Sequence, residues 1–133
     1  MAGCVGPGGA VHAAEIKQEM VDKLKQKFAN LPQIKPYLCQ PDDPALPEAA
    51  CDLAFISQVY HHLPKDARVE YLRKLRRAIK PQGRLCVIEK YSEIAPQGKD
   101  HGTQLSVVIA EAEQAGWVAV RCELMPATAH YLA

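Results

Sequence analysis

Short apolar runs alternate with amphipathic segments along this chain, and this alternation constrains its fold more than any other feature. Residues 51–57 and 84–89 form apolar runs too short for helices, so each predicts a buried strand. Segments at about 65–79 and from 105 onward carry apolar residues at helical spacing instead. Strands that alternate with helices predict an α/β fold, with a mainly parallel sheet and flanking helices.

The rest of the chain continues this alternation. Residues 10–15 predict a short strand and 17–29 a helix. Residues 33–39 predict an edge strand, because Pro36 cannot donate a ladder hydrogen bond. The expected inward stripes of the three helices are Ile16, Met20, Leu24 and Phe28; Val69, Leu72, Leu75 and Ile79; and Leu105, Val108, Ile109 and Ala112.

The last third of the chain predicts two more strands. Gly116 stands where a helix commonly ends in a left-handed residue. Residues 117–124 then predict a strand, and 128–132 a final short one. A polar loop at 91–102 lies where an acceptor would be selected, but its composition names no acceptor.

Composition indicates an ordinary globular chain. Of its 133 residues, 48% are hydrophobic and 23% charged, so we expect a single domain over 1–133. A net charge of +1 gives no general electrostatic case for nucleic acid or an anionic membrane. No apolar run approaches the ~20 residues that span a bilayer, and no signal-peptide pattern opens the chain. We therefore expect a cytoplasmic protein.

Five cysteines agree with that compartment. Their number is odd and no C-x-x-C motif occurs. Four of them, at positions 39, 51, 86 and 122, sit in apolar runs. We expect buried free thiols that act as small hydrophobes, rather than zinc ligands or disulfides.

Polar residues follow the predicted strands, and in parallel sheets ligands bind beyond the carboxyl ends of strands. Glu15 closes the first strand, where its carboxylate could accept hydrogen bonds from a ribose diol or be a solvated charge at the next helix. Asp42 and Asp43 lie in a proline-rich loop. One of them could accept from an adenine amine, or both could be turn residues.

A second group follows the apolar run 51–57. Gln58, Tyr60, His61 and His62 offer donors, acceptors and a base that titrates near neutrality. Adjacent histidines on an extended chain point to opposite sides and no third ligand is spaced for a metal, so we expect none. The alternative is a loop histidine that caps the following helix.

The order and spacing of several pieces resemble class I S-adenosylmethionine-dependent methyltransferases, from about Val5 to the end. The pieces are Val5-Gly6-Pro7-Gly8-Gly9-Ala10-Val11, Ala14-Glu15-Ile16, Asp42-Asp43-Pro44-Ala45-Leu46-Pro47, Cys51-Asp52-Leu53-Ala54-Phe55-Ile56, Tyr60-His61-His62-Leu63, Leu75-Arg76-Arg77-Ala78-Ile79-Lys80-Pro81-Gln82-Gly83-Arg84-Leu85 and Ala115-Gly116-Trp117. The resemblance implies a Rossmann-like methyltransferase fold and S-adenosylmethionine as cofactor.

The same resemblance implies roles for the strand-end residues. Glu15 would hold the ribose hydroxyls and Asp42 or Asp43 the adenine, and Ile16 would also belong to the cofactor site. Gln58 would belong to the cofactor site and, with Tyr60 and His61, would line the methyl-transfer face. Methyl transfer is an in-line displacement that depends on positioning, and a base is needed when the acceptor carries a proton. His61 or His62 could be that base.

The sequence departs from the family at its start. Family members begin with a strand, an acidic-Gly-x-Gly-x-Gly loop and a helix, and nothing before Val5 supplies them. The glycines at positions 3, 6, 8 and 9 precede a strand, whereas a dinucleotide fingerprint follows one. We therefore expect a fold without its first strand and helix, with weaker cofactor binding. Strand 51–57 would then pair with strand 10–15 or leave an open edge for a second copy or a completing protein.

Two functions follow from these observations. The first is a truncated methyltransferase with an unknown acceptor. The alternative is a non-catalytic methyltransferase-like module that binds protein. A nicotinamide oxidoreductase ranks behind both, because its glycine fingerprint is missing.

Overall fold

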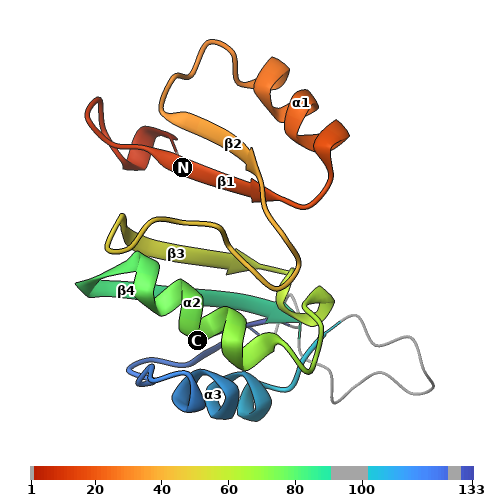
Figure 1. The fold of residues 1–133 in the computed structure, drawn as a ribbon. Helices are drawn as coiled ribbons and strands as arrows, with labels where there is room; N and C mark the ends of the chain where they lie inside the picture. The colour runs from red at the N-terminus through yellow and green to blue at the C-terminus, as the bar shows by residue number, and fades with distance from the viewer. Residues whose placement is uncertain (1, 91–101, 126–129) are drawn as a thin grey trace. The chain divides into compact units, whose positions relative to one another are not determined.

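A computed structural model describes residues 2–90, 102–125 and 130–133. The chain forms two compact units, residues 1–45 and 46–133, which are described separately. Figure 1 shows the elements, which in chain order are η1 (Ala2–Cys4), β1 (Val11–Glu15), α1 (Gln18–Lys27), β2 (Ile34–Leu38), β3 (Cys51–Ser57), η2 (Tyr60–His62), α2 (Arg68–Ala78), β4 (Ile79–Lys90), α3 (Leu105–Gln114), β5 (Glu123–Met125) and β6 (His130–Leu132).

The first unit is a β–α–β unit whose two strands run parallel. β1 pairs with β2 from Val11 opposite Ile34 to Glu15 opposite Leu38. The strands predicted at 10–15 and 33–39 are both present. Pro36 is tolerated because β2 has only one neighbour in this two-stranded sheet.

The inward face of α1 differs from the predicted stripe. Val21 is buried and Leu24 and Phe28 are half-buried, whereas Ile16 and Met20 are exposed. Four residues turn an α-helix by about 400°, so a strict repeat of four drifts around the helix by about 40° per step. The predicted stripe was therefore right in its second half and wrong in its first.

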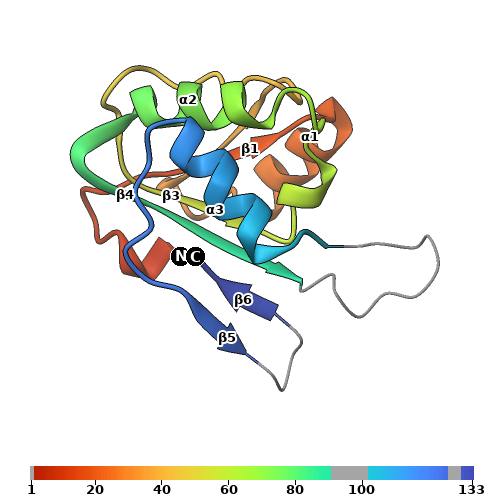
Figure 2. The ribbon, with the colours of Figure 1, turned by 90° about the horizontal axis from the view of Figure 1, so that it is seen from below.

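The second unit is built on a four-stranded sheet in the order β3-β4-β6-β5. β3 and β4 run parallel, and β6 is antiparallel to both of its neighbours. Helices α2 and α3 pack against each other on one face of this sheet (Figures 1 and 2). β3 is the terminal strand of this four-stranded sheet.

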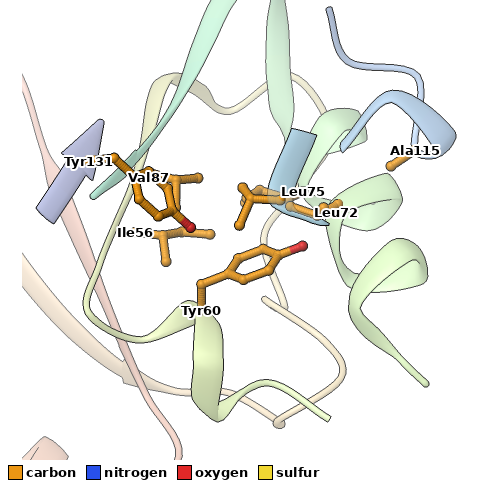
Figure 3. Packing of buried hydrophobic residues seen from close by; sticks show 8 residues of the cluster. Ile56, Tyr60, Leu72, Leu75, Val87, Ala115 and Tyr131 are labelled. Carbon is orange, nitrogen blue, oxygen red and sulfur yellow. The ribbon is translucent and has the colours of Figure 1, made fainter. Parts of the chain in front are cut away.

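The core of this unit lies between the sheet and the two helices (Figure 3). Its buried members are Ile56, Tyr60, Leu72, Leu75, Val87, Val108, Ala115 and Tyr131. Successive side chains of a strand point to opposite faces, so Leu53 and Phe55 lie on the face away from Ile56. They are 53% and 42% exposed, which makes β3 half-buried rather than fully buried as predicted.

The second helix and the strand after it are both present as predicted, but their boundaries differ from the predicted ones. α2 begins at Arg68, three residues later than predicted, and ends before Ile79, which starts β4. β4 is longer than the predicted 84–89 and runs through Gly83. A Cβ on Gly83 would lie 2.7 Å from the Asp52 carbonyl oxygen, so glycine allows the strand to pass there.

The last elements match the prediction only in part. α3 is present and Gly116 has a left-handed φ of +88°, as predicted. The strand predicted at 117–124 is reduced to β5, and residues 117–122 have no regular structure. β6 supplies only three residues to pair with β5, so the ladder stops there. Residues 126–129, and 91–101 of the predicted polar loop, lie outside the described residues.

All five cysteines are free thiols. Cys39 is buried, and Cys51 and Cys86 are half-buried. Cys122 is exposed, so its predicted burial is wrong, because the segment that carries it is not part of the sheet. None of the described helices has the length and apolar character needed to cross a membrane.

Candidate functional site

Glu15 ends β1 at the start of α1. Its Oε1 accepts hydrogen bonds from the backbone N–H of Ile16 at 2.8 Å and of Lys17 at 3.1 Å. A carboxylate at this position is stabilised by the dipole of the helix that follows. The structural alternative considered for Glu15, a charge at the start of the helix, therefore describes Oε1, and Oε2 accepts no hydrogen bond from the described residues. Ile16, directly beside it, is 52% exposed.

Asp42 and Asp43 lie in the loop after β2. Asp43 Oδ1 accepts from the Ala45 N–H at 2.7 Å, and the backbones of Gln40 and Asp43 bond to each other. The Tyr37 hydroxyl donates to the Pro44 carbonyl at 2.6 Å, which holds the loop against β2. Asp43 is thus the turn residue of the pair, and Asp42 is the exposed carboxylate.

Cys39 shows that Glu15 and the loop lie close together. Its N–H donates to the Glu15 carbonyl at 2.9 Å. Burial raises the pKa of the Cys39 thiol, and the negative charges of Glu15 and Asp43 raise it further. Both carboxylates therefore act on one thiol at the carboxyl ends of β1 and β2, the end where parallel sheets bind ligands.

Gln58 has an unusual backbone conformation directly after β3. Its φ is +52°, in the left-handed region that favours glycine, and its N–H donates to the Ile88 carbonyl at 2.8 Å. Such a residue costs on the order of 1–3 kcal/mol, and strain of this kind clusters at functional sites. The bond to β4 holds Gln58 in this conformation, with its side chain exposed.

Tyr60 is completely buried. Its hydroxyl donates to Glu111 Oε2 at 2.5 Å, and the Arg68 guanidinium lies 5.1 Å from its ring centre. Burial, followed by the hydrogen bond to Glu111, raises the pKa of Tyr60 well above its usual value. The phenol therefore stays protonated and acts as a donor that ties η2 to α3.

Arg68 fixes the turn that carries the histidines. Its side chain is 5% exposed and donates from Nε to the Leu63 carbonyl at 3.2 Å and from Nη2 to the His61 carbonyl at 3.3 Å. Nη1 lies 3.9 Å from Glu111 Oε2, which supplies the opposite charge. A buried charge needs such partners, and here they connect the turn to α3.

His61 is paired with a buried carboxylate. Its Nδ1 lies 2.9 Å from Glu89 Oε2, and its backbone N–H donates to the same oxygen at 3.1 Å. Glu89 is fully buried at the end of β4, and its Oε1 accepts from the Lys90 N–H at 2.7 Å. A carboxylate on Nδ1 fixes the orientation of the ring and the tautomer that keeps the lone pair on Nε2.

The His62 ring lies beside that of His61. Their ring centres are 4.0 Å apart with a tilt of 48°, so the expectation that they point to opposite sides is wrong. The physical reason is that both residues lie in the η2 turn rather than on extended chain. Within the part of the chain that the structure describes, no three potential metal ligands cluster.

The structure brings the predicted residues together in two groups. Glu15, Ile16, Asp42 and Asp43 belong to the first unit, and Gln58, Tyr60, His61 and His62 to the second. Sequence reasoning assigned no role to three partners of the second group: Glu89, Glu111 and Arg68. Glu89 had a usable signal, since it is a carboxylate that closes an apolar strand, as Glu15 does.

A family model described as a methyltransferase domain matches residues 1–83. The chain belongs to the methyltransferase domain family. This confirms the resemblance to class I S-adenosylmethionine-dependent methyltransferases. A search of curated proteins found no match.

Solved methyltransferases share this fold. A SAM-dependent methyltransferase from Aquifex aeolicus matches with a TM-score of 0.86 and 22% identity, over 98% of this chain and 70% of that one. One from Leishmania major matches at 0.76 and 15%, over 93% and 53%. The CcbJ methyltransferase from Streptomyces caelestis also matches at 0.76 and 15%, over 92% and 77%. The predicted Rossmann-like methyltransferase fold is confirmed.

Proposed function

We propose that this chain binds S-adenosylmethionine and transfers its methyl group to an acceptor that carries a hydroxyl or amine proton. The observation that supports this best is the His61–Glu89 pair at the carboxyl ends of β3 and β4, in a chain that belongs to the methyltransferase family.

The residues of the first unit suit the adenosine part of that cofactor. Ribose hydroxyls and the adenine amine are donors, and the strand-end groups Glu15 and Asp42 are carboxylate acceptors. Each charge-assisted hydrogen bond contributes about 1.5–3 kcal/mol. Exposed Ile16 offers an apolar surface next to Glu15. When bound, the cofactor supplies a methyl group on a positively charged sulfur.

The second unit supplies the base in this proposal. Nε2 of His61 accepts the proton that the acceptor loses, while Glu89 holds the ring through Nδ1. Gln58 lines the same strand end, and Tyr60 positions the turn through its bond to Glu111. His62 is exposed and has no contact with Glu89 in the described residues, so His61 is the assigned base.

Cofactor binding gives the decisive test. Titration of S-adenosylmethionine into the purified chain by calorimetry is expected to show binding that the Glu15→Gln variant weakens by roughly 10- to 100-fold, the equivalent of one charge-assisted bond. Glu19→Gln is the matched control, since Glu19 lies four residues further along, in the first turn of α1, and pairs only with Lys23 in the described residues.

The outcome separates the two candidate functions. If far-UV circular dichroism shows that the chain is folded but the chain does not bind millimolar S-adenosylmethionine, the proposed methyltransferase function is wrong. It would leave the non-catalytic protein-binding module, which the exposed Leu53 and Phe55 favour. Equal affinities of the Glu15→Gln and Glu19→Gln variants would remove Glu15 from the site.

The proposal keeps three further expectations from the sequence. The two units form one methyltransferase domain, since one solved methyltransferase matches 98% of the chain. In this proposal the domain is a shortened form of the family fold, and the chain spans 53% to 77% of the three methyltransferases compared. The compartment is the cytoplasm, where five free thiols are kept reduced.

We also propose that the exposed side of β3 binds a second copy or a completing protein. Parallel strands are normally covered on both faces, yet about half of the Leu53 and Phe55 side-chain surface is exposed on a terminal strand that pairs in parallel with β4. Light scattering of the purified chain is expected to give a mass above that of one chain. The Leu53→Lys/Phe55→Lys variant is expected to lower it, whereas Leu31→Lys, at another exposed leucine, is not. A wild-type monomer at high concentration would rule out self-association.

A further inference from the structure

Ionisable side chains from four different elements converge around the η2 turn that carries the histidines. Glu89 of β4 and Tyr131 of β6 are fully buried, and Arg68 of α2 is buried as well. Glu111 of α3 is half-buried. Figure 3 shows Tyr131 and Tyr60, the first residue of the turn, within the same core. Charges that face water in most proteins are therefore gathered in the interior of this unit.

The contacts of the turn show that these charges lie close to one another. The Arg68 guanidinium reaches the His61 carbonyl at 3.3 Å and Glu111 Oε2 at 3.9 Å. Glu89 Oε2 lies 2.9 Å from His61 Nδ1. Burial, and next the charge of Glu89, raises the pKa of the Tyr131 phenol. The charge of Arg68 lowers that pKa and the charge of Glu111 raises it, so all three charges act on one buried phenol.

The formal charges of this cluster leave one carboxylate in excess. Glu89 and Glu111 carry two negative charges, and Arg68 carries one positive charge. With a neutral imidazole at His61 the cluster has a net charge of about −1, and with an imidazolium its charges balance. Water screens charges weakly in the interior, so this balance matters more than it would at the surface. The proton that His61 accepts in the proposed reaction removes the excess charge.

Other ionisable groups around the turn, among the described residues, are screened or neutral. His62 and Lys90 are exposed, so solvent screens their charges. Tyr60 and Tyr131 stay neutral, because burial raises the pKa of each phenol. His130 of β6 lies opposite Lys90 in the ladder. None of these groups changes in the variants below, so their contributions cancel when the variants are compared.

We propose that Arg68 and Glu111 are positioning residues that set the proton affinity of His61 in opposite directions. The inference rests on the proposed function, which makes His61 the base of methyl transfer. The charge of Arg68 disfavours an imidazolium beside it. Glu111 cancels that charge and so leaves Glu89 to pair with the imidazolium. The transferred proton stays on His61 Nε2, and both carboxylates remain ionised throughout.

The pH at which His61 is half protonated tests this balance directly. NMR of the imidazole ring protons measures this midpoint in the full chain without cofactor, and His61→Asn identifies the signal by removing it. Glu111→Gln removes a negative charge at constant volume, so the midpoint is expected to fall by about one pH unit. Arg68→Met removes a positive charge, so the midpoint is expected to rise by about as much. The double variant loses one charge of each sign, and its midpoint is expected to return to within about 0.3 unit of the wild type.

Matched controls change charges that solvent screens. Glu113→Gln on α3 and Arg73→Met on α2 alter exposed side chains, and both are expected to leave the midpoint unchanged. Arg68→Lys separates charge from geometry. It keeps the positive charge but loses the planar fork that holds two carbonyls of the turn, so the midpoint is expected to stay while methyl transfer slows.

Activity gives a second and independent readout. The acid limb of the kcat/KM profile is expected to move with the NMR midpoint, to lower pH in Glu111→Gln and to higher pH in Arg68→Met. Shifted NMR midpoints in a chain without methyl transfer would contradict the proposed function and still support the charge balance.

Two results would overturn the charge balance. One is a shift of the same sign in both single variants, because a merely structural role displaces the turn in each and predicts no opposite signs. The other is an unchanged midpoint in a folded Glu111→Gln variant, which decides the question even where Arg68→Met does not fold.

Discussion

The His61→Asn variant is expected to lose methyl transfer by about 10²- to 10⁴-fold, the range that a positioned general base contributes. Asparagine can still donate a hydrogen bond to Glu89 but offers no basic nitrogen to the acceptor. Cofactor affinity is expected to be unchanged, because no cofactor role is assigned to His61. The measurement is the release of S-adenosylhomocysteine with hydroxyl and amine acceptors, together with calorimetric titration of the cofactor.

Two further variants locate the base. Glu89→Gln keeps the volume of the buried side chain but removes its charge, so it is expected to give a smaller loss and an altered pH profile, as a positioning residue would. His62→Asn is the matched control, since His62 is exposed and lies outside the contact with Glu89. A larger loss in His62→Asn than in His61→Asn would move the base to His62.

The Leu72→Ala variant is expected to lower the free energy of unfolding by about 2–5 kcal/mol, the range for deleting a buried leucine. Leu72 is fully buried at the centre of the core between the sheet and the two helices (Figure 3). The bond from Trp117 Nε1 to its backbone carbonyl, at 3.1 Å, survives the change, so the loss reports on the side chain.

Urea denaturation followed by circular dichroism measures this change. Val69→Ala, on the same helix but only half-buried, is expected to cost less. An unchanged midpoint in Leu72→Ala would mean that the inward face of α2 is wrongly assigned.

Strands β3 and β4 and helix α2 could be predicted from the sequence because their burial leaves a clear pattern. The run 51–57 is too short for a helix, and Leu72 and Leu75 recur at helical spacing. The strand-end carboxylate Glu15 was found for the same reason, since a charged residue that ends an apolar run is visible without a structure.

The errors come from elements whose state depends on a neighbour. Residues 117–122 have strand-forming side chains, but a strand needs a ladder partner, and on this side β6 pairs only with Glu123–Met125 of β5. The exposure of Leu53 and Phe55 likewise depends on what covers that face. The local sequence indicates which residues favour a strand, but it does not indicate whether another strand or layer lies beside them.

Side-chain pairs distant in sequence were also missed. Glu89 and His61 lie 28 residues apart, and Tyr60 and Glu111 lie 51 apart. Nothing local to either residue marks such a pair, because it forms only when the fold brings η2 beside the end of β4 or beside α3. The sequence identified both histidines as candidate bases. Only the contact of His61 with Glu89 in the structure distinguishes the two.

Arg68 and Tyr60 couple Glu111 of α3 to the turn that carries the histidines, more than forty positions earlier in the chain. Whether α3 tolerates a substitution at Glu111 therefore depends on that turn. Loss of the Glu111 carboxylate would leave a guanidinium in the interior without its counter-charge, and the same guanidinium holds the carbonyls of His61 and Leu63. Related chains that change residue 111 therefore have to change residue 68 as well, or give up the rigidity of the histidine turn.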